Sequence, residues 1–393
     1  MKTDSLLLYN AQVYLEEQVI DDGFVYIQDG AIVSAGPIAL MPKDDAIKKT
    51  ELEQGSKIIP GFIDVHIHGA AGADTMDGTK DALETIATQL PAEGTTSFLA
   101  TTITQGKDRI NQALKNVAKY LQTDNLPGKA EILGVHLEGP FINPSKKGAQ
   151  PENHIINPDL KLFDEWQKES GDSIRLVTSA PEQQNGISFI KHLTEKGIIS
   201  SIGHSDATFE QVKDAVAAGS THVTHLFNGM RGLHHREPGL AGAAILMEKL
   251  KAEIIADGVH VSPEMVKLAV KAKGTDGVIL ITDSMRAKCL KNGHYDLGGQ
   301  DVTVADGKAL LSDGTLAGSI LKMIDSVSNI IEFTGLELED AIMMASVNPA
   351  KQLGIYNRKG SISPGKDADI AILNQQNNVV LTYCRGKEAY RAK

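Results

Sequence analysis

Short apolar segments alternate with helix-length amphipathic segments along the middle of the chain, and this alternation restricts the fold more than any other feature. Nearly continuous apolar strands that alternate with helices indicate a parallel sheet buried on both faces. Eight such units favour a closed (β/α)8 barrel over an open doubly wound sheet. The predicted strands are residues 58–67, 95–102, 131–137, 174–179, 198–202, 221–226, 252–256 and 277–281. The predicted helices are 81–93, 107–121, 158–169, 186–196, 208–218 and 263–273.

Both ends of the chain consist instead of short β-type runs separated by turn signals, such as Asp29-Gly30 near the start and residues 364–367 near the end. Two β-rich ends around an α/β middle indicate one small domain built from both termini. We therefore predict an α/β chain with a TIM-like (β/α)8 barrel over residues 58–357. The ends, residues 1–57 and 358–393, are predicted to form a small β-sandwich domain.

The formal net charge of −11 argues against nucleic acid or an anionic membrane as the main partner, because both attract basic surfaces. An anionic substrate would therefore need a local cation. Two isolated cysteines, Cys289 and Cys384, fit a reducing compartment. No apolar run approaches the roughly 20 residues of a membrane helix, and the apolar stretch near the N-terminus is too short for a signal peptide. These features predict a cytoplasmic protein.

Histidines and carboxylates stand where the predicted strands end, which is where a barrel of this kind carries its active site. His66 and His68 end the first strand with one residue between them, so both imidazoles should face the barrel mouth. Imidazole pairs bind zinc, iron or nickel. Taken alone, this pair is equally compatible with two histidines hydrogen-bonded in an ordinary strand end.

Glu138, His204 and His225 end the third, fifth and sixth predicted strands. A carboxylate at the end of an apolar strand needs a partner, either a salt bridge or one or two cations. Each histidine alone is more often a satisfied core residue. Two histidines and a carboxylate on one arc of the rim would, however, hold a metal and leave a position open for water.

Asp283 ends the eighth strand, which closes the ring beside the first. A carboxylate there is suited to act on a metal-bound water as general base and then as general acid. Its alternative role is to cap the following segment. The joint pattern of six suitable residues at these strand ends favours a metal-dependent amide hydrolase.

Three further segments attract attention. Residues 285–319 predict a long loop with several turn signals, typical of an active-site cover or binding loop. Residues 238–242 and 316–319 are Gly- and Ala-rich. They would either bring backbone amides to a ligand or allow close packing.

Eight sequence motifs carry a resemblance to a known family. The chain resembles the N-acetylglucosamine-6-phosphate deacetylases of the amidohydrolase superfamily, in consistent order from about residue 59 to residue 319. The resemblance implies a barrel with a small β domain. It also implies hydrolysis of N-acetyl-D-glucosamine 6-phosphate to D-glucosamine 6-phosphate and acetate, by attack of a metal-bound hydroxide with Asp283 as general base and then acid. The motifs are PGFIDVHIHG, HLEGPF, GHSDA, THLFNGM, HHREPGLAG, IADGVH, ITDSM and DGTLAGS.

Site residues follow from the matching positions. The resemblance implies two divalent ions, zinc or iron, held by His66, His68, Glu138, His204 and His225, with Glu138 bridging. It implies a homodimer in which Arg236 reaches the substrate phosphate in the neighbouring subunit. The remaining implied substrate contacts are Ala149, Asn228, Gly229, His260, Leu316, Ala317, Gly318 and Ser319. Gly229 stands where alanine is common and Gln150 where some members have histidine, which leaves the contacts to the sugar open.

Two other interpretations compete with this one. Dihydroorotase-like or hydantoinase-like enzymes bridge their metals with a carboxylated lysine from the fourth strand, but residues 178–182 contain no lysine. A non-catalytic sugar-phosphate sensor on the same barrel would be indicated by loss of Asp283 or of a metal histidine, and all of these residues are present.

Overall fold

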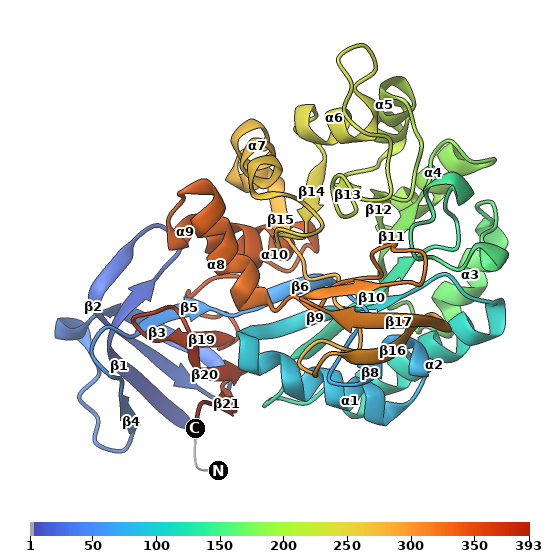
Figure 1. The fold of residues 1–393 in the computed structure, drawn as a ribbon. Coiled ribbons are helices and arrows are strands. Elements are labelled where there is room, and N and C mark those ends of the chain that lie inside the picture. The colour runs from blue at the N-terminus through green and yellow to red at the C-terminus, as the bar shows by residue number, and fades with distance from the viewer. Residues whose placement is uncertain (1–3) are drawn as a thin grey trace.

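The structure is a computed structural model that describes residues 4–393, and its larger part is a ring of eight parallel strands (Figure 1). Adjacent strands follow one another along the chain, which confirms the predicted barrel. At the rim, the ring is closed by backbone bonds from Asp283 N to His66 O and from His68 N to Ser284 O, both 2.9 Å. The strands are β6 (Phe62–Ile67), β9 (Thr95–Thr102), β10 (Glu131–Glu138), β11 (Ile174–Ser179), β12 (Ile199–Ile202), β13 (His222–Val223), β14 (Lys251–Ile254) and β15 (Val278–Leu280).

Helices cover the outside of the ring (Figure 1), and most of them bury one apolar face. In α2, for example, Ile110, Leu114 and Val117 recur at helical spacing and are fully buried. The helix α5 begins with a capping box between Thr208 and Gln211. The helices are α1 (Lys80–Gln89), α2 (Lys107–Thr123), α3 (Leu160–Glu169), α4 (Gly186–Glu195), α5 (Phe209–Ala218), α6 (Gly239–Leu246), α7 (Pro263–Lys273), α8 (Met323–Thr334), α9 (Leu338–Ile342) and α10 (Asn348–Gln352).

The helix α6 was not predicted. Residues 238–242 open this helix, and all but one of its residues are buried. Its small residues serve close packing, since a Cβ on Gly242 would lie 2.5 Å from the Pro238 side chain. Of the two roles considered for this segment, the structure therefore favours packing.

The first predicted strand, residues 58–67, proves to be two strands. β5 (Lys57–Pro60) pairs with strands from both ends of the chain, and β6 begins the barrel after Gly61. A side chain at Gly61 would lie 2.2 Å from that of Thr96, so only glycine allows the chain to pass so close to the next barrel strand. An unbroken apolar run gave no sign of this division.

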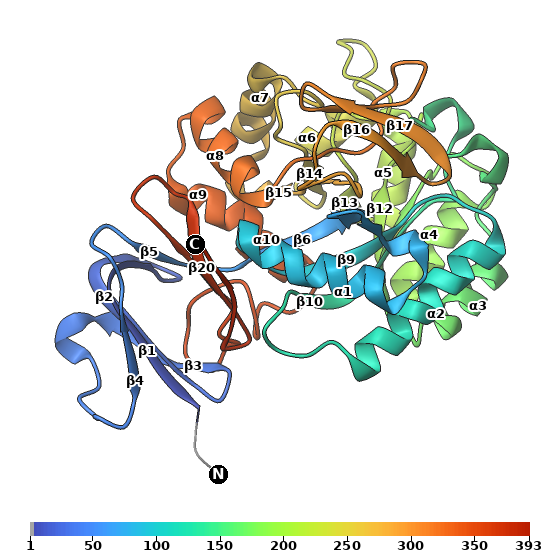
Figure 2. The same cartoon turned by 60° about the horizontal axis from the view of Figure 1, so that its bottom comes forward.

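Strands from both chain ends form one mixed sheet beside the barrel, and the two sets lie side by side in Figures 1 and 2. A small domain built from both termini is thereby confirmed, and its strands belong to a single sheet. The domain limits after residues 57 and 357 remain a proposal, because β5 belongs to this sheet and runs directly into the barrel. The order is β21-β20-β19-β5-β1-β2-β3, with β4 on β1. These strands are β1 (Ser5–Tyr14), β2 (Val19–Gln28), β3 (Ala31–Pro37), β4 (Lys48–Glu51), β19 (Ile370–Leu373), β20 (Val379–Cys384) and β21 (Lys387–Arg391).

A buried ion-pair network joins the small sheet to the N-terminal end of the barrel strands. Lys359, whose side chain is 1% exposed, contacts Asp369 before β19 and lies 2.7 Å from Glu131 at the start of β10.

Within residues 4–393, no helix is long and apolar enough to cross a membrane.

Residues 285–319 are not the loop that the sequence predicted. They form a small antiparallel sheet of β16 (Gly293–Leu297), β17 (Gln300–Ala305) and β18 (Lys308–Leu310), separate from both larger sheets (Figure 2). The turn signals at 298–299 and 306–307 fall between these strands. The ends of the segment meet, since Ser284 and Ser319 form a parallel bridge. We call residues 285–318 the cover segment.

A short hairpin of β7 (Gly69–Ala70) and β8 (Ala73–Asp74) follows the first barrel strand, as the glycines after His68 allow.

Candidate metal centre and active site

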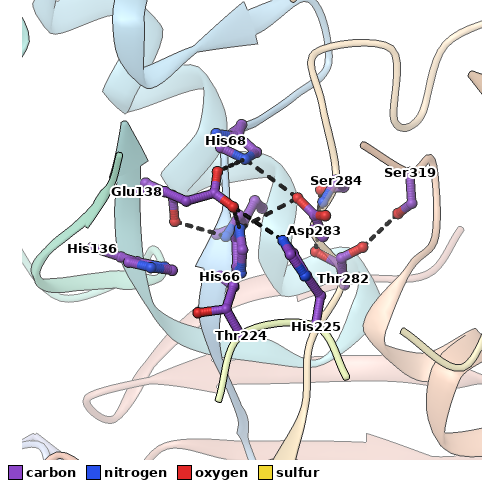
Figure 3. Close-up of polar contacts among 12 residues, drawn as sticks. His66, His68, His136, Glu138, Thr224, His225, Thr282, Asp283, Ser284 and Ser319 are labelled. Carbon is purple, nitrogen blue, oxygen red and sulfur yellow. Dashed lines mark hydrogen bonds and ion pairs between the residues drawn. The ribbon is translucent and has the colours of Figure 1, made fainter. Parts of the chain in front are cut away.

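The polar side chains at the strand ends converge on the carboxylate of Glu138, the last residue of β10 (Figure 3). Its Oε1 lies 3.5 Å from Nε2 of His66, 3.1 Å from Nε2 of His204 and 3.2 Å from Nε2 of His225. Its Oε2 lies 3.3 Å from Nε2 of His68. The structure therefore brings together all five residues predicted as metal ligands.

Asp283 completes the cluster from the end of β15. Its Oδ1 lies 3.4 Å from Nε2 of His66 and 3.3 Å from Nε2 of His68, on the side of these imidazoles away from His136 (Figure 3). Closure of the barrel explains this position, because the backbone N–H of Asp283 donates a hydrogen bond to the carbonyl oxygen of His66.

Three of the cluster residues have left-handed backbone conformations. The φ angles of His204, His225 and Asp283 are 47°, 30° and 46°. Non-glycine residues rarely adopt this region, and such strain concentrates at functional sites. Here it lies just beyond the ends of β12, β13 and β15, where the chain turns and the side chains enter the cluster.

Hydrogen bonds determine which nitrogen of three imidazoles carries the proton. Each Nδ1 faces an oxygen that can only accept, so in the neutral ring Nδ1 carries the proton and Nε2 is the nitrogen left to ligate a cation. The Nε2 atoms of His204 and His225 lie 3.1 Å apart and both face Oε1 of Glu138, so one cation could take up all three donor atoms. The pairs are His66 Nδ1 with Glu253 Oε2 at 2.9 Å, His204 Nδ1 with Lys146 O at 2.8 Å, and His225 Nδ1 with Asn228 O at 3.1 Å.

The donor atoms around the pocket form two groups that fit a divalent cation, and a third group of His66, His136 and Glu253 lies beside them. One group is Glu138, His204 and His225, the other is His66, His68 and Asp283, and the donors in each lie within 4.8 Å of one another. Among residues 4–393, the buried Nε2 of His66 has no hydrogen-bond partner. Imidazole nitrogens with carboxylate oxygens are donors that zinc and iron(II) accept.

Electrostatics agree with this fit. Burial alone would raise the pKa of Glu138, but His66 and the bonds from the other histidines hold it well below its usual range. Burial likewise opposes protonation of His66 and His68, yet the surrounding carboxylates raise the pKa of His66 well above its usual value and that of His68 to about 10. Without a metal, the cluster therefore holds protons to balance its negative charge.

Sequence reasoning missed Glu253 and His222. Glu253 lies within the apolar strand β14, fully buried, and its Oε1 accepts from Nε2 of His222 at 3.0 Å. Burial would raise the pKa of Glu253, but His66 and the bonds from both histidines hold it well below its usual range. An acidic residue inside an otherwise apolar run, residues 252–256, was the available signal.

Two more side chains support the cluster from outside. Gln150 donates to Oε2 of Glu138 at 2.7 Å, and its own Oε1 accepts from the backbone N–H of Thr104 at 2.8 Å. His136 contacts Thr178 through Nε2 at 2.7 Å and packs edge-on against His66. These contacts give His136 a structural role beside His66.

A pocket opens onto the cluster, and most of the predicted substrate contacts line it. Ala317 and Ser319 do not, because Ala317 is fully buried and Ser319 donates to Thr282 O. Arg236 lies on an exposed loop, with Nη1 2.8 Å from Nε2 of His235, and does not line the pocket of its own chain. The predicted residues in the lining are Ala149, Asn228, Gly229, His260, Leu316 and Gly318.

A parallel barrel with this donor set at the C-terminal ends of its strands is that of a metal-dependent hydrolase. The chain belongs to the amidohydrolase family, whose pattern residues 58–389 match. It is 48% identical over 392 residues to N-acetylglucosamine-6-phosphate deacetylase of Bacillus subtilis, covering 99% of this chain and 98% of that protein. It is 43% identical to the enzyme of that name from Lysinibacillus sphaericus, covering 94% of each chain.

Solved structures agree with the sequence relatives. The crystal structure of N-acetylglucosamine-6-phosphate deacetylase from Thermotoga maritima superposes with a TM-score of 0.88 at 35% identity, covering 98% of this chain and 100% of that one. The resemblance inferred from the motifs is thereby confirmed. The roles of the individual site residues remain predictions.

Proposed function

We propose that this chain hydrolyses the acetamide of N-acetyl-D-glucosamine 6-phosphate, releasing D-glucosamine 6-phosphate and acetate. The observation that carries the proposal is the convergence of four imidazole nitrogens and two carboxylates at the base of one pocket. The sequence relatives, which bear the name of this activity over nearly their whole length, support the choice of substrate. A cytoplasmic location stays a prediction.

Two divalent ions, zinc or iron(II), would be held here. Glu138, His204 and His225 would bind one, and His66 and His68 the other, with Glu138 between them. The chemistry supplied by bound ions is polarisation of the acetyl carbonyl and acidification of a water molecule. Gln150, which donates to Glu138, holds that carboxylate in place.

Asp283 would move the proton. Its carboxylate accepts a proton from the attacking water and delivers it to the amide nitrogen as the carbon–nitrogen bond breaks. The cover segment contributes Leu297, Leu316 and Gly318 to the pocket lining and so shields the reacting groups from bulk water.

The test is acetate release by metal-loaded protein from N-acetylglucosamine 6-phosphate, followed together with appearance of the free amine. Its C4 epimer and unphosphorylated N-acetylglucosamine are compared by kcat/KM. We expect the 6-phosphate of the gluco sugar to be preferred. Preference for the epimer would correct the substrate, and no acetate from any of the three would contradict the proposed reaction.

Changing His66 and His68 together to Asn should lower the metal content of fully loaded protein from two ions per chain toward one. Both imidazoles contact Glu138 through Nε2, whereas His204 and His225 keep their own contacts with it. Elemental analysis measures the change, with His192→Asn on α4 as the control that keeps both ions. A wild-type protein that never takes up more than one ion would contradict the two-ion centre.

Arg236→Ala should lower kcat/KM for the 6-phosphate substrate roughly 30-fold. This corresponds to about 2 kcal/mol of lost transition-state stabilisation, because a charge-assisted pair with the phosphate is removed. A chain of net charge −11 needs a dedicated cation for a phosphate dianion. Activity on the unphosphorylated sugar should barely change. Arg109→Ala, on the exposed surface of α2, is the matched control.

Mixed dimers test whether Arg236 acts across the proposed homodimer interface. A dimer of one Arg236→Ala subunit and one Asp283→Asn subunit has one site with an intact Asp283 and a partner arginine. Random mixing of the two variants should therefore restore about a quarter of wild-type activity. Absence of any recovery would place the action of Arg236 within its own subunit or outside substrate binding.

A further inference from the structure

Glu253 is a carboxylate in the buried part of the barrel strand β14. It is fully buried in β14, where its neighbours Ala252 and Ile254 are also fully buried. Removing a carboxylate from water is costly unless strong partners compensate. An apolar residue would fill this position at lower cost, so the side chain requires another explanation.

The carboxylate accepts three N–H groups. Oε2 lies 2.9 Å from Nδ1 of His66 and 3.1 Å from the backbone nitrogen of His225. Oε1 lies 3.0 Å from Nε2 of His222. One side chain thus holds a residue from each of the two candidate metal groups, His66 by its ring and His225 by its backbone.

The bond to His66 fixes both the tautomer and the direction of that ring. Because Nδ1 donates to Glu253, Nε2 is the nitrogen that points into the cluster, 3.5 Å from Glu138 and 3.4 Å from Asp283. Among the described residues, that buried nitrogen has no hydrogen-bond partner. It is therefore placed to ligate a cation that enters the cluster.

His222 supports Glu253 from the other side. Among the described residues, the imidazole of His222 makes one hydrogen bond, to Glu253, and its buried Nδ1 has no partner. The imidazole therefore has no contact with the cluster itself. Its effect is to fix the carboxylate, so that Glu253 cannot rotate away from His66.

We propose that Glu253, backed by His222, is a positioning residue that holds His66 ready to ligate the second divalent ion. The inference rests on the two-ion centre proposed above and deepens it. Glu253 touches no reacting atom, so it acts only through the histidines. Partners of this kind, which donate or accept at the far nitrogen of a metal-binding imidazole, typically change metal affinity by about 10- to 100-fold when removed.

The test is titration of metal-free protein with Zn²⁺ against a chelator of known affinity, for wild type and for Glu253→Gln. Glutamine keeps the volume and can still accept from His66, but it lacks the charge and cannot accept from both histidines. We expect the dissociation constant of one of the two ions to rise about 10- to 100-fold, with the other nearly unchanged. Excess Zn²⁺ should restore kcat, as a positioning role requires.

Two further variants keep the result decisive. Glu253→Asp retains the charge but is too short to reach His66 and His222 together, so it should fold and also bind one ion more weakly. Glu131→Gln, at the start of β10 and so at the N-terminal end of the barrel, removes a carboxylate of the Lys359 network and should leave both ions in place.

Thermal unfolding of the metal-free forms separates metal effects from stability. Unchanged Zn²⁺ titrations in both Glu253 variants, with lowered stability, would overturn the inference and leave Glu253 a structural residue. Uptake of fewer than two ions by wild type would instead contradict the two-ion centre itself. The two failures are therefore distinguishable.

Discussion

We expect Asp283→Asn to lower kcat by about two to four orders of magnitude, which is the usual contribution of a general acid and base. An amide nitrogen is a poor leaving group and must receive a proton as the carbon–nitrogen bond breaks. The Asp283 carboxylate can accept a proton and return it, whereas an asparagine amide cannot. Metal content and substrate affinity should stay near wild type, measured by elemental analysis and by binding of intact substrate to the inactive variant.

Asparagine is the informative replacement because the backbone at position 283 is left-handed. Asp283 has a φ of 46°, a conformation that Asn tolerates better than alanine does. Asp306→Asn, at a turn residue with a φ of 50°, controls for the substitution itself and should leave kcat unchanged. A variant at 283 with more than roughly a tenth of wild-type kcat would contradict the proton-transfer role. Loss of the metal would identify Asp283 as a ligand instead.

Glu138→Gln should remove both ions and, with them, nearly all activity. Glu138 is the one side chain in contact with all four histidines of the cluster, and an amide offers neither its charge nor its second oxygen. Loss of metal-assisted polarisation is worth several kcal/mol, which corresponds to about three orders of magnitude or more in rate.

The matched control is Glu182→Gln. Glu182 follows β11 near the same rim, but it accepts from Ser205 and the backbone of Asp206 and has no contact with the cluster. That variant should keep both ions. If Glu138→Gln also retains two ions by elemental analysis, the bridging position assigned to Glu138 is wrong.

The barrel and the cluster were predictable because they depend on the spacing of apolar segments along the chain and on the common direction of parallel strands. In a parallel sheet all C-terminal strand ends meet at one edge, so residues far apart in sequence, such as His66 and Asp283, can be placed together from strand ends alone. The same rule could not find Glu253. It sits inside a strand rather than at its end, and its function appears only when His66 and His222 are seen on either side of it.

Other features depend on contacts that sequence does not display. The division of the first run at Gly61 follows from the closeness of Thr96, and the packing of α6 follows from the approach of Gly242 to Pro238. The cover segment was recognised by its length and turns, but its sheet was not. Its strands are short and mostly half exposed, so they lack the buried apolar character that marked the barrel.

The pairing of β5 has a consequence for how the chain is made. β5 ends at residue 60, yet its neighbour β19 begins only at residue 370. At about 5 to 20 residues per second, a ribosome needs roughly 15 to 60 seconds to supply that partner. Throughout this interval the nascent protein presents an unpaired strand edge, a template for joining other chains. A stalled or C-terminally shortened product would keep that edge permanently, which makes aggregation the natural fate of incomplete synthesis.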